Sequence, residues 1–100
     1  MISFKKEENS IVCIPQVNMV ASNVSAMRDR ILSKIESLEW QELIVDCSEG
    51  DTLDSIGVNL VVGLFKKAES TSSQFKMTGC NDAIKKVLNL FRLDQKFSVE

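Results

Sequence analysis

A short apolar run followed by a long one limits the folds open to this chain more than any other feature. The short run, Leu43 to Asp46, leads into a polar loop, and the long run extends from Ser55 to Ala68. A short apolar run bounded by polar residues is typical of a buried strand in a parallel sheet. The second run is too long for a strand and ends near lysines, which is typical of a buried helix. The segment is therefore predicted to form a strand, a loop and a helix.

The junction between loop and helix carries a carboxylate, Asp54, beside a hydroxyl, Ser55. Unpaired backbone N–H groups and the positive end of the helix dipole collect at such a point. A phosphate group would be tolerated there. Asp54 is predicted to cap the helix, to position the Ser55 hydroxyl, or to do both. Ser55 on its own has a plain interpretation as a residue that favours a helix start.

Strand-like and helix-like segments alternate along the rest of the chain. Short apolar or alternating runs predict strands at Ile2–Lys5, Ile11–Ile14, Phe75–Thr78 and Phe97–Val99. Helical spacing predicts a first helix from Asn23, with Ser22 or Asn23 as its cap, and a third helix after the cap Asn81. The expected inner residues are Val24, Met27, Ile31, Ile35 and Leu38 in the first, and Ile84, Val87, Leu88 and Phe91 in the third.

This alternation predicts an α/β domain with a mostly parallel sheet of four to five strands, about three helices and right-handed crossovers. In such sheets working residues gather at the carboxyl ends of the strands. We therefore expect one edge to carry Asp46, Ser48, the 50–55 loop, Gly79 and Asn81. Asp46 is expected to order the loop by accepting backbone N–H bonds.

Composition restricts the classes of function. A chain of 100 residues, 44% apolar and 26% charged, fits one globular domain over residues 1–100. A net charge of −2 disfavours nucleic-acid binding. No apolar run is long enough to span a bilayer, and the first residues do not resemble a signal peptide. The sequence therefore predicts no membrane insertion and a cytoplasmic location. The three cysteines, Cys13, Cys47 and Cys80, are expected to be reduced packing residues.

The sequence does not predict an enzyme. It has no histidine, no G-x-G-x-x-G and no P-loop, and no serine or cysteine has an identifiable base. Asp46, Asp51 and Asp54 could in principle hold a magnesium ion, but their spacing matches no established pattern. No metal site and no cofactor of its own are expected.

The residues Asp46-Cys47-Ser48, followed by Asp54-Ser55-Ile56-Gly57-Val58, resemble the D-x-S and D-S-x-G-[LV] signature of STAS domains, especially those of anti-sigma factor antagonists. The likeness continues to Ala68, resumes from Ile84 to Phe97, and covers roughly two thirds of the chain. Two positions depart from the family pattern. Ile56 stands where members often have a second hydroxyl residue, and apolar Val20 stands where an Asp is common before the first helix.

The resemblance implies a regulatory protein that switches partners. In that family an anti-sigma factor serine kinase, which brings its own ATP and magnesium, binds the unphosphorylated antagonist and releases sigma factor. Phosphorylation, here implied at Ser55, ends the binding, and a serine phosphatase resets the cycle. The alternative is a STAS adaptor that is never phosphorylated and belongs to a larger signalling or lipid-transport assembly.

Helical spacing defines the surface where a partner is expected. Asn59 lies one turn beyond Ser55, with Val58 and Val62 beside it, so these residues are predicted to form a partner-binding stripe. A core helix with one solvated asparagine is the alternative. Gly57 supports the phosphosite in the family signature, and its missing side chain indicates close approach by another backbone or by a partner.

Overall fold

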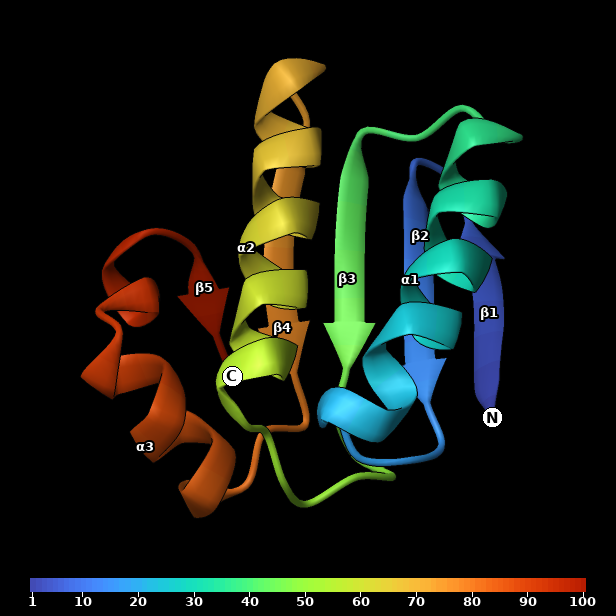
Figure 1. Ribbon diagram of the computed structural model, residues 1–100. Coiled ribbons are helices and arrows are strands. Elements are labelled where there is room, and N and C mark those ends of the chain that lie inside the picture. Colours follow the sequence, from blue (N-terminus) through green and yellow to red (C-terminus); the bar gives the residue numbers. More distant parts are fainter.

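Strands and helices follow one another in the predicted alternation (Figure 1). The structure is a computed structural model that describes residues 1–100. The strands are β1 (Ile2–Glu7), β2 (Ser10–Pro15), β3 (Glu42–Asp46), β4 (Gln74–Thr78) and β5 (Ser98–Val99). The helices are α1 (Ala21–Glu36), α2 (Ser55–Ser70) and α3 (Asp82–Leu90), with a short 3₁₀ helix, η1 (Leu93–Gln95).

The five strands form one sheet whose order follows the sequence, β1-β2-β3-β4-β5. Only β1 and β2 pair antiparallel; every later pair is parallel, as predicted. Because the parallel strands advance in one direction and crossovers are right-handed, the connecting helices lie on one face of the sheet. Figure 1 shows α1 and α2 side by side in front of the strands.

The core lies between the sheet and this helical layer. It is a single cluster of 24 buried residues, in which Leu43 and Val45 of β3 pack with alternate residues of the neighbouring strands. Val12 is buried but lies outside that cluster, between Lys5 of β1 and Ile44 of β3 in the sheet register. Since neighbouring residues on a strand point to opposite faces, Val12 and Ile44 belong to the open face of the sheet.

The start of α1 corrects one sequence-based prediction. The helix begins at Ala21 and its N-cap residue is Val20. The apolar side chain of Val20 cannot accept the hydrogen bond that would cap the helix. Ser22 and Asn23, the predicted caps, lie inside the first turn. Asn23 instead uses its amide to donate to the carbonyl of Asn18, so its polar group orders the preceding loop.

The third helix is shorter than its apolar pattern predicts. Ile84 and Leu88 are buried as expected, but Phe91 follows the helix as its C-cap and is 52% exposed. The chain then reverses at Arg92, which has a left-handed φ of 59°, and continues into η1. Phe97 takes the interior position instead, where its ring packs against Phe65 and Phe75.

None of the helices combines the length and the apolar character needed to cross a bilayer.

Candidate functional site

The loop that joins β3 to α2 is held by side chains from two other loops. The carbonyl oxygen of the Asn18 side chain accepts hydrogen bonds from the backbone N–H groups of Asp51, at 2.9 Å, and Thr52, at 3.2 Å. From the opposite side, the Asn81 amide donates to the Asp51 carbonyl at 3.2 Å. Asn81 was predicted at this edge, whereas Asn18 was missed because no local pattern marks a contact so distant in sequence.

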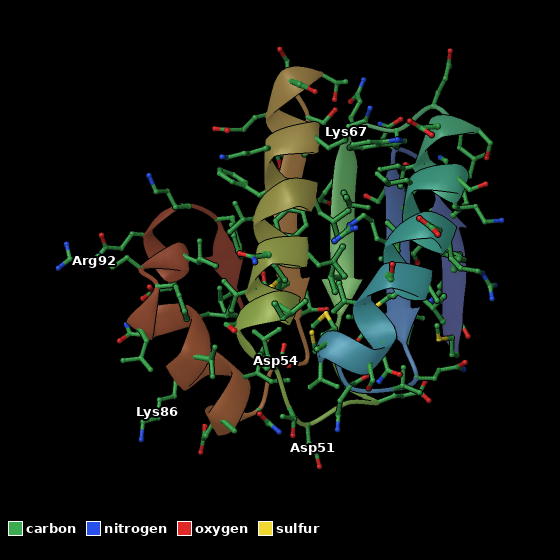
Figure 2. The ribbon with its side chains drawn as sticks, viewed as in Figure 1. Asp51, Asp54, Lys67, Lys86 and Arg92 are labelled. Carbon is green, nitrogen blue, oxygen red and sulfur yellow. The ribbon has the colours of Figure 1, made fainter.

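Asp54 caps two helices at once. One carboxylate oxygen accepts from the Gly57 N–H at 2.8 Å, which is the predicted N-cap of α2. The other oxygen accepts from the Ala21 N–H at 2.9 Å, at the start of α1. Asp54 therefore supplies from another loop the acceptor that Val20 lacks. Figure 2 shows Asp54 at the base of α2, and Asp51 in the loop that leads to it.

These hydrogen bonds lower the pKa of the Asp54 carboxyl, with the Gly57 N–H as the largest cause and the Ala21 N–H next. Asp54 is solvated, so its effect depends on the two hydrogen bonds and the two helix dipoles rather than on burial. A lowered pKa means that the folded state favours the charged carboxylate more than the unfolded chain does.

We expect Asp54→Asn to lower the melting temperature at neutral pH, because the amide loses the charge that both helix starts favour. The stabilisation by Asp54 is complete above the ordinary pKa of 3.8 and is lost as the pH falls through the lower folded-state value. Thermal melts across this range should therefore converge for the two proteins at acid pH. A difference in melting temperature that stays constant down to the lowest pH would contradict the assignment.

Asp46 behaves as the sequence predicts. Its carboxylate accepts from the Ser48 N–H at 2.9 Å and so turns the chain out of β3. Gly79 lies against it: a Cβ atom there would be 2.8 Å from the carboxylate oxygen, and the left-handed φ of 66° also favours glycine. Asp46, Asp51 and Asp54 each face different neighbours and do not converge on a common point.

Ser55 is the first residue of α2 and is exposed. The exposed side of the helix continues through residues that we call the α2 face: Ser55, Ile56, Asn59, Val62 and Gly63. Ile56 is 41% exposed and adds apolar surface beside Ser55. Gly63 has no atom within 4 Å of the place where a Cβ would lie, so nothing in this domain requires a glycine there.

Of the residues predicted for the partner-binding stripe, Val58 turns inward and Val62 does so only in part. Val58 is only 3% exposed and packs in the core, so its predicted place on the partner-binding stripe is wrong. Helical spacing explains this: Val58 shares a side of the helix with Val61 and Ala68, which face the sheet. Val62 remains half-buried at the border of the α2 face.

The close neighbour of Gly57 is a backbone segment of the same domain. A Cβ at this position would lie 2.0 Å from the Met19 carbonyl oxygen, a backbone atom of the segment that leads into α1. Met19 and Leu53 also form an isolated parallel bridge, and the Asp54 N–H donates to Met19 at 3.3 Å. The glycine therefore serves packing within the domain, and it keeps the starts of α1 and α2 together.

This arrangement of strand, ordered loop and capped helix is accompanied by a sequence match that extends over the whole domain. Residues 2–100 match the STAS domain family. The chain belongs to this family. As a STAS domain, it carries its D-S-x-G segment at the carboxyl edge of the sheet, with Asp54 at the cap of α2 and Ser55 at its first position.

The relatives of this STAS domain include anti-sigma factor antagonists. A candidate anti-sigma factor antagonist of Thermotoga maritima is 18% identical over 95 residues, which span 95% of this chain and 84% of the relative. A crystal structure of such a candidate from the same organism superposes with a TM-score of 0.91 at 16% identity, covering 98% and 84% of the two chains. The unphosphorylated anti-sigma factor antagonist SpoIIAA gives 0.83 at 17% identity, covering 100% and 88%. At these identities the structures establish a shared fold.

Proposed function

We propose that this STAS domain is a non-enzymatic regulatory protein of the anti-sigma factor antagonist type, switched by phosphorylation of Ser55. The proposed partner is an anti-sigma factor serine kinase that brings its own ATP and magnesium. The unphosphorylated domain binds this kinase and frees sigma factor, and a serine phosphatase restores that state. Such partners meet in the cytoplasm, where we propose that the protein acts.

The position of Ser55 is the observation that carries this proposal. Its side chain is exposed at the first position of α2, where the positive end of the helix dipole favours a phosphate group. Asp54 holds the backbone around it through two hydrogen bonds, so the hydroxyl is presented from a fixed helix start. A kinase needs a hydroxyl that is both accessible and well positioned.

The rest of the α2 face supports a protein partner. Ile56 offers exposed apolar surface directly beside Ser55, and Asn59 offers a polar group one turn further on. The bare backbone at Gly63 allows another chain to approach closely. These features form one strip along a rigid helix, which suits a contact between folded proteins.

The proposed switch acts at the interface and requires no refolding. A phosphate on Ser55 adds a charge of about −1.5 to −2 and three oxygens at the edge of this strip. The start of α2 tolerates that charge, so the domain stays folded. A partner packed against Ile56 and Asn59 would have to desolvate the phosphate, and it would therefore bind less tightly.

We expect incubation with Mg-ATP and a cognate anti-sigma factor kinase to add one phosphate to the wild-type protein and none to Ser55→Ala. Since Asp54 caps α2, the loss of the Ser55 hydroxyl should change the free energy of unfolding by no more than about 0.5 kcal/mol. Intact mass and peptide mapping measure the modification, and urea denaturation measures the stability.

Ser70→Ala is the matched control, because Ser70 is an exposed serine at the opposite end of the same helix. This variant should accept phosphate as the wild type does. A phosphate mapped to Ser48, Ser70 or Ser73 instead of Ser55 would overturn the assignment.

A further inference from the structure

Two of the three cysteines lie at the ends of neighbouring strands, next to the loop that joins β3 to α2. Cys47 directly follows β3 and Cys80 follows β4, and both are buried, at 2% and 8% exposure. The strands are parallel neighbours in which Asp46 lies opposite Thr78, and the Cys47 N–H donates to the Thr78 carbonyl at 2.8 Å. The sheet therefore brings both residues to the same point of its carboxyl edge.

Gly79 completes the pairing of the two side chains. In the strand register, Cys47 would lie opposite residue 79, but the left-handed φ at Gly79 turns the chain there. Cys80 consequently takes the inner position beside Cys47, and its thiol donates to the Thr78 carbonyl oxygen at 3.8 Å. The two buried side chains are therefore neighbours at the ends of adjacent strands.

The two thiols differ in chemistry, and both differ from Cys13. Interaction with the neighbouring Cys47 thiol, supported by the charge of Lys85, lowers the pKa of Cys80 against the opposing effect of burial. The same interaction, followed by burial, raises the pKa of Cys47. Cys13 is fully buried and burial alone raises its pKa to about 12. Since the thiolate is the reactive form, we expect an oxidant to attack Cys80 before the other two thiols.

We propose that Cys47 and Cys80 form a redox pair that small peroxides oxidise to an intramolecular disulfide. The Cys80 thiolate attacks one oxygen of hydrogen peroxide, the O–O bond breaks, and the departing hydroxide takes a proton to become water. Cys80 is then a sulfenic acid. The Cys47 sulfur attacks the Cys80 sulfur, the S–O bond breaks, and the Cys47 thiol proton leaves with the hydroxide as a second water. In total, two thiols are oxidised and one peroxide is reduced to two waters.

The disulfide would tie together the two segments that hold the loop before Ser55. Cys47 opens that loop, and Cys80 precedes Asn81, whose amide donates to the Asp51 carbonyl and whose carbonyl oxygen caps α3. The pair therefore provides an oxidation site next to the proposed phosphorylation site. It depends only on the meeting of the two thiols, and it stands whether or not Ser55 is phosphorylated.

The test treats the reduced, folded protein with hydrogen peroxide, removes the oxidant, denatures the chain and alkylates it with iodoacetamide. The untreated protein should take up three alkyl groups, one for each cysteine. The oxidised protein should take up one, on Cys13, and a proteolytic digest should contain a linked peptide pair holding Cys47 and Cys80. Reduction before alkylation should restore all three. This measurement needs no substitution, so it does not depend on whether a cysteine variant folds.

Cysteine variants then assign the order of attack. Cys47→Ser should leave a sulfenic acid on Cys80 that dimedone traps, whereas Cys80→Ser should give little adduct on Cys47. Cys13→Ser, the control, should form the disulfide as readily as the wild type. Three alkyl groups after peroxide treatment, a disulfide that includes Cys13, or oxidation seen only once circular dichroism shows unfolding would each overturn the proposal.

Discussion

Gly57→Ala is expected to lower the free energy of unfolding by about 3 kcal/mol or more, at the upper end of the range for overpacking. The added methyl carbon would lie 2.0 Å from the Met19 carbonyl oxygen and 2.6 Å from Leu53 Cδ1. The Leu53 side chain can move, but the Met19 carbonyl is backbone and accepts the Asp54 N–H. Relief of the contact therefore has to separate the starts of α1 and α2. Urea denaturation of both proteins measures the difference.

Gly63→Ala is the matched control, since it makes the same change in the same helix. No atom lies within 4 Å of the new methyl group, and the position is exposed. Alanine restricts the unfolded chain more than glycine does, so this variant should be more stable by about 0.5–1 kcal/mol. Equal effects of the two substitutions would show that only the difference in helix propensity between glycine and alanine acts at both positions, and would refute the packing argument.

Ser55→Asp is expected to weaken binding to the anti-sigma factor kinase about tenfold or more, if the proposed switch is correct. The aspartate places a negative charge where the partner has to pack, with less bulk than a phosphate. Phosphorylated Ser55 should weaken binding further, because its charge is larger. Asn59→Ala should also bind less tightly, since it removes a polar contact of the α2 face. Titration calorimetry against one purified kinase measures all of these affinities.

Lys5→Ala is a suitable control, because Lys5 is exposed and lies beside Val12 in the sheet register, on the open face away from α2. It should bind as the wild type does. Equal affinities for wild type, Ser55→Asp and Asn59→Ala would remove the switch and leave a constitutive adaptor as the interpretation. Weaker binding by Lys5→Ala alone would move the interface to the sheet.

The order of strands and helices could be predicted because each element carries its own local pattern. Leu43 and Val45 alternate, and Val24, Met27, Ile31 and Ile35 recur at helical spacing, and all six are buried as that spacing requires. The caps at Asp54 and Asn81 could also be predicted from the sequence, because a capping residue precedes the N–H group it binds by only three positions.

The parts of the site that depend on distant segments could not be predicted. Asp54 binds Ala21 and Asn18 binds Asp51, and both partners are 33 residues away in the sequence. The errors at Val58, at Phe91 and at Leu38, which lies past the end of α1 and is 40% exposed, have a local cause. A helix as apolar as α2 gives no contrast to indicate which side is solvated, and an apolar residue just past the end of a helix still fits the helical spacing.

The sheet order also determines how the chain can assemble. Ser10 lies opposite Glu42 and Glu42 lies opposite Gln74, so the β2–β3 and β3–β4 pairings close segments of equal length. Loop-closure entropy then favours neither pairing over the other, because it depends only weakly on length and the lengths are the same. No strand has to enter between two strands that have already paired. We therefore expect the nucleation site to be decided by side-chain packing, and substitutions in β3, which takes part in both pairings, to slow folding more than substitutions in β1 or β5.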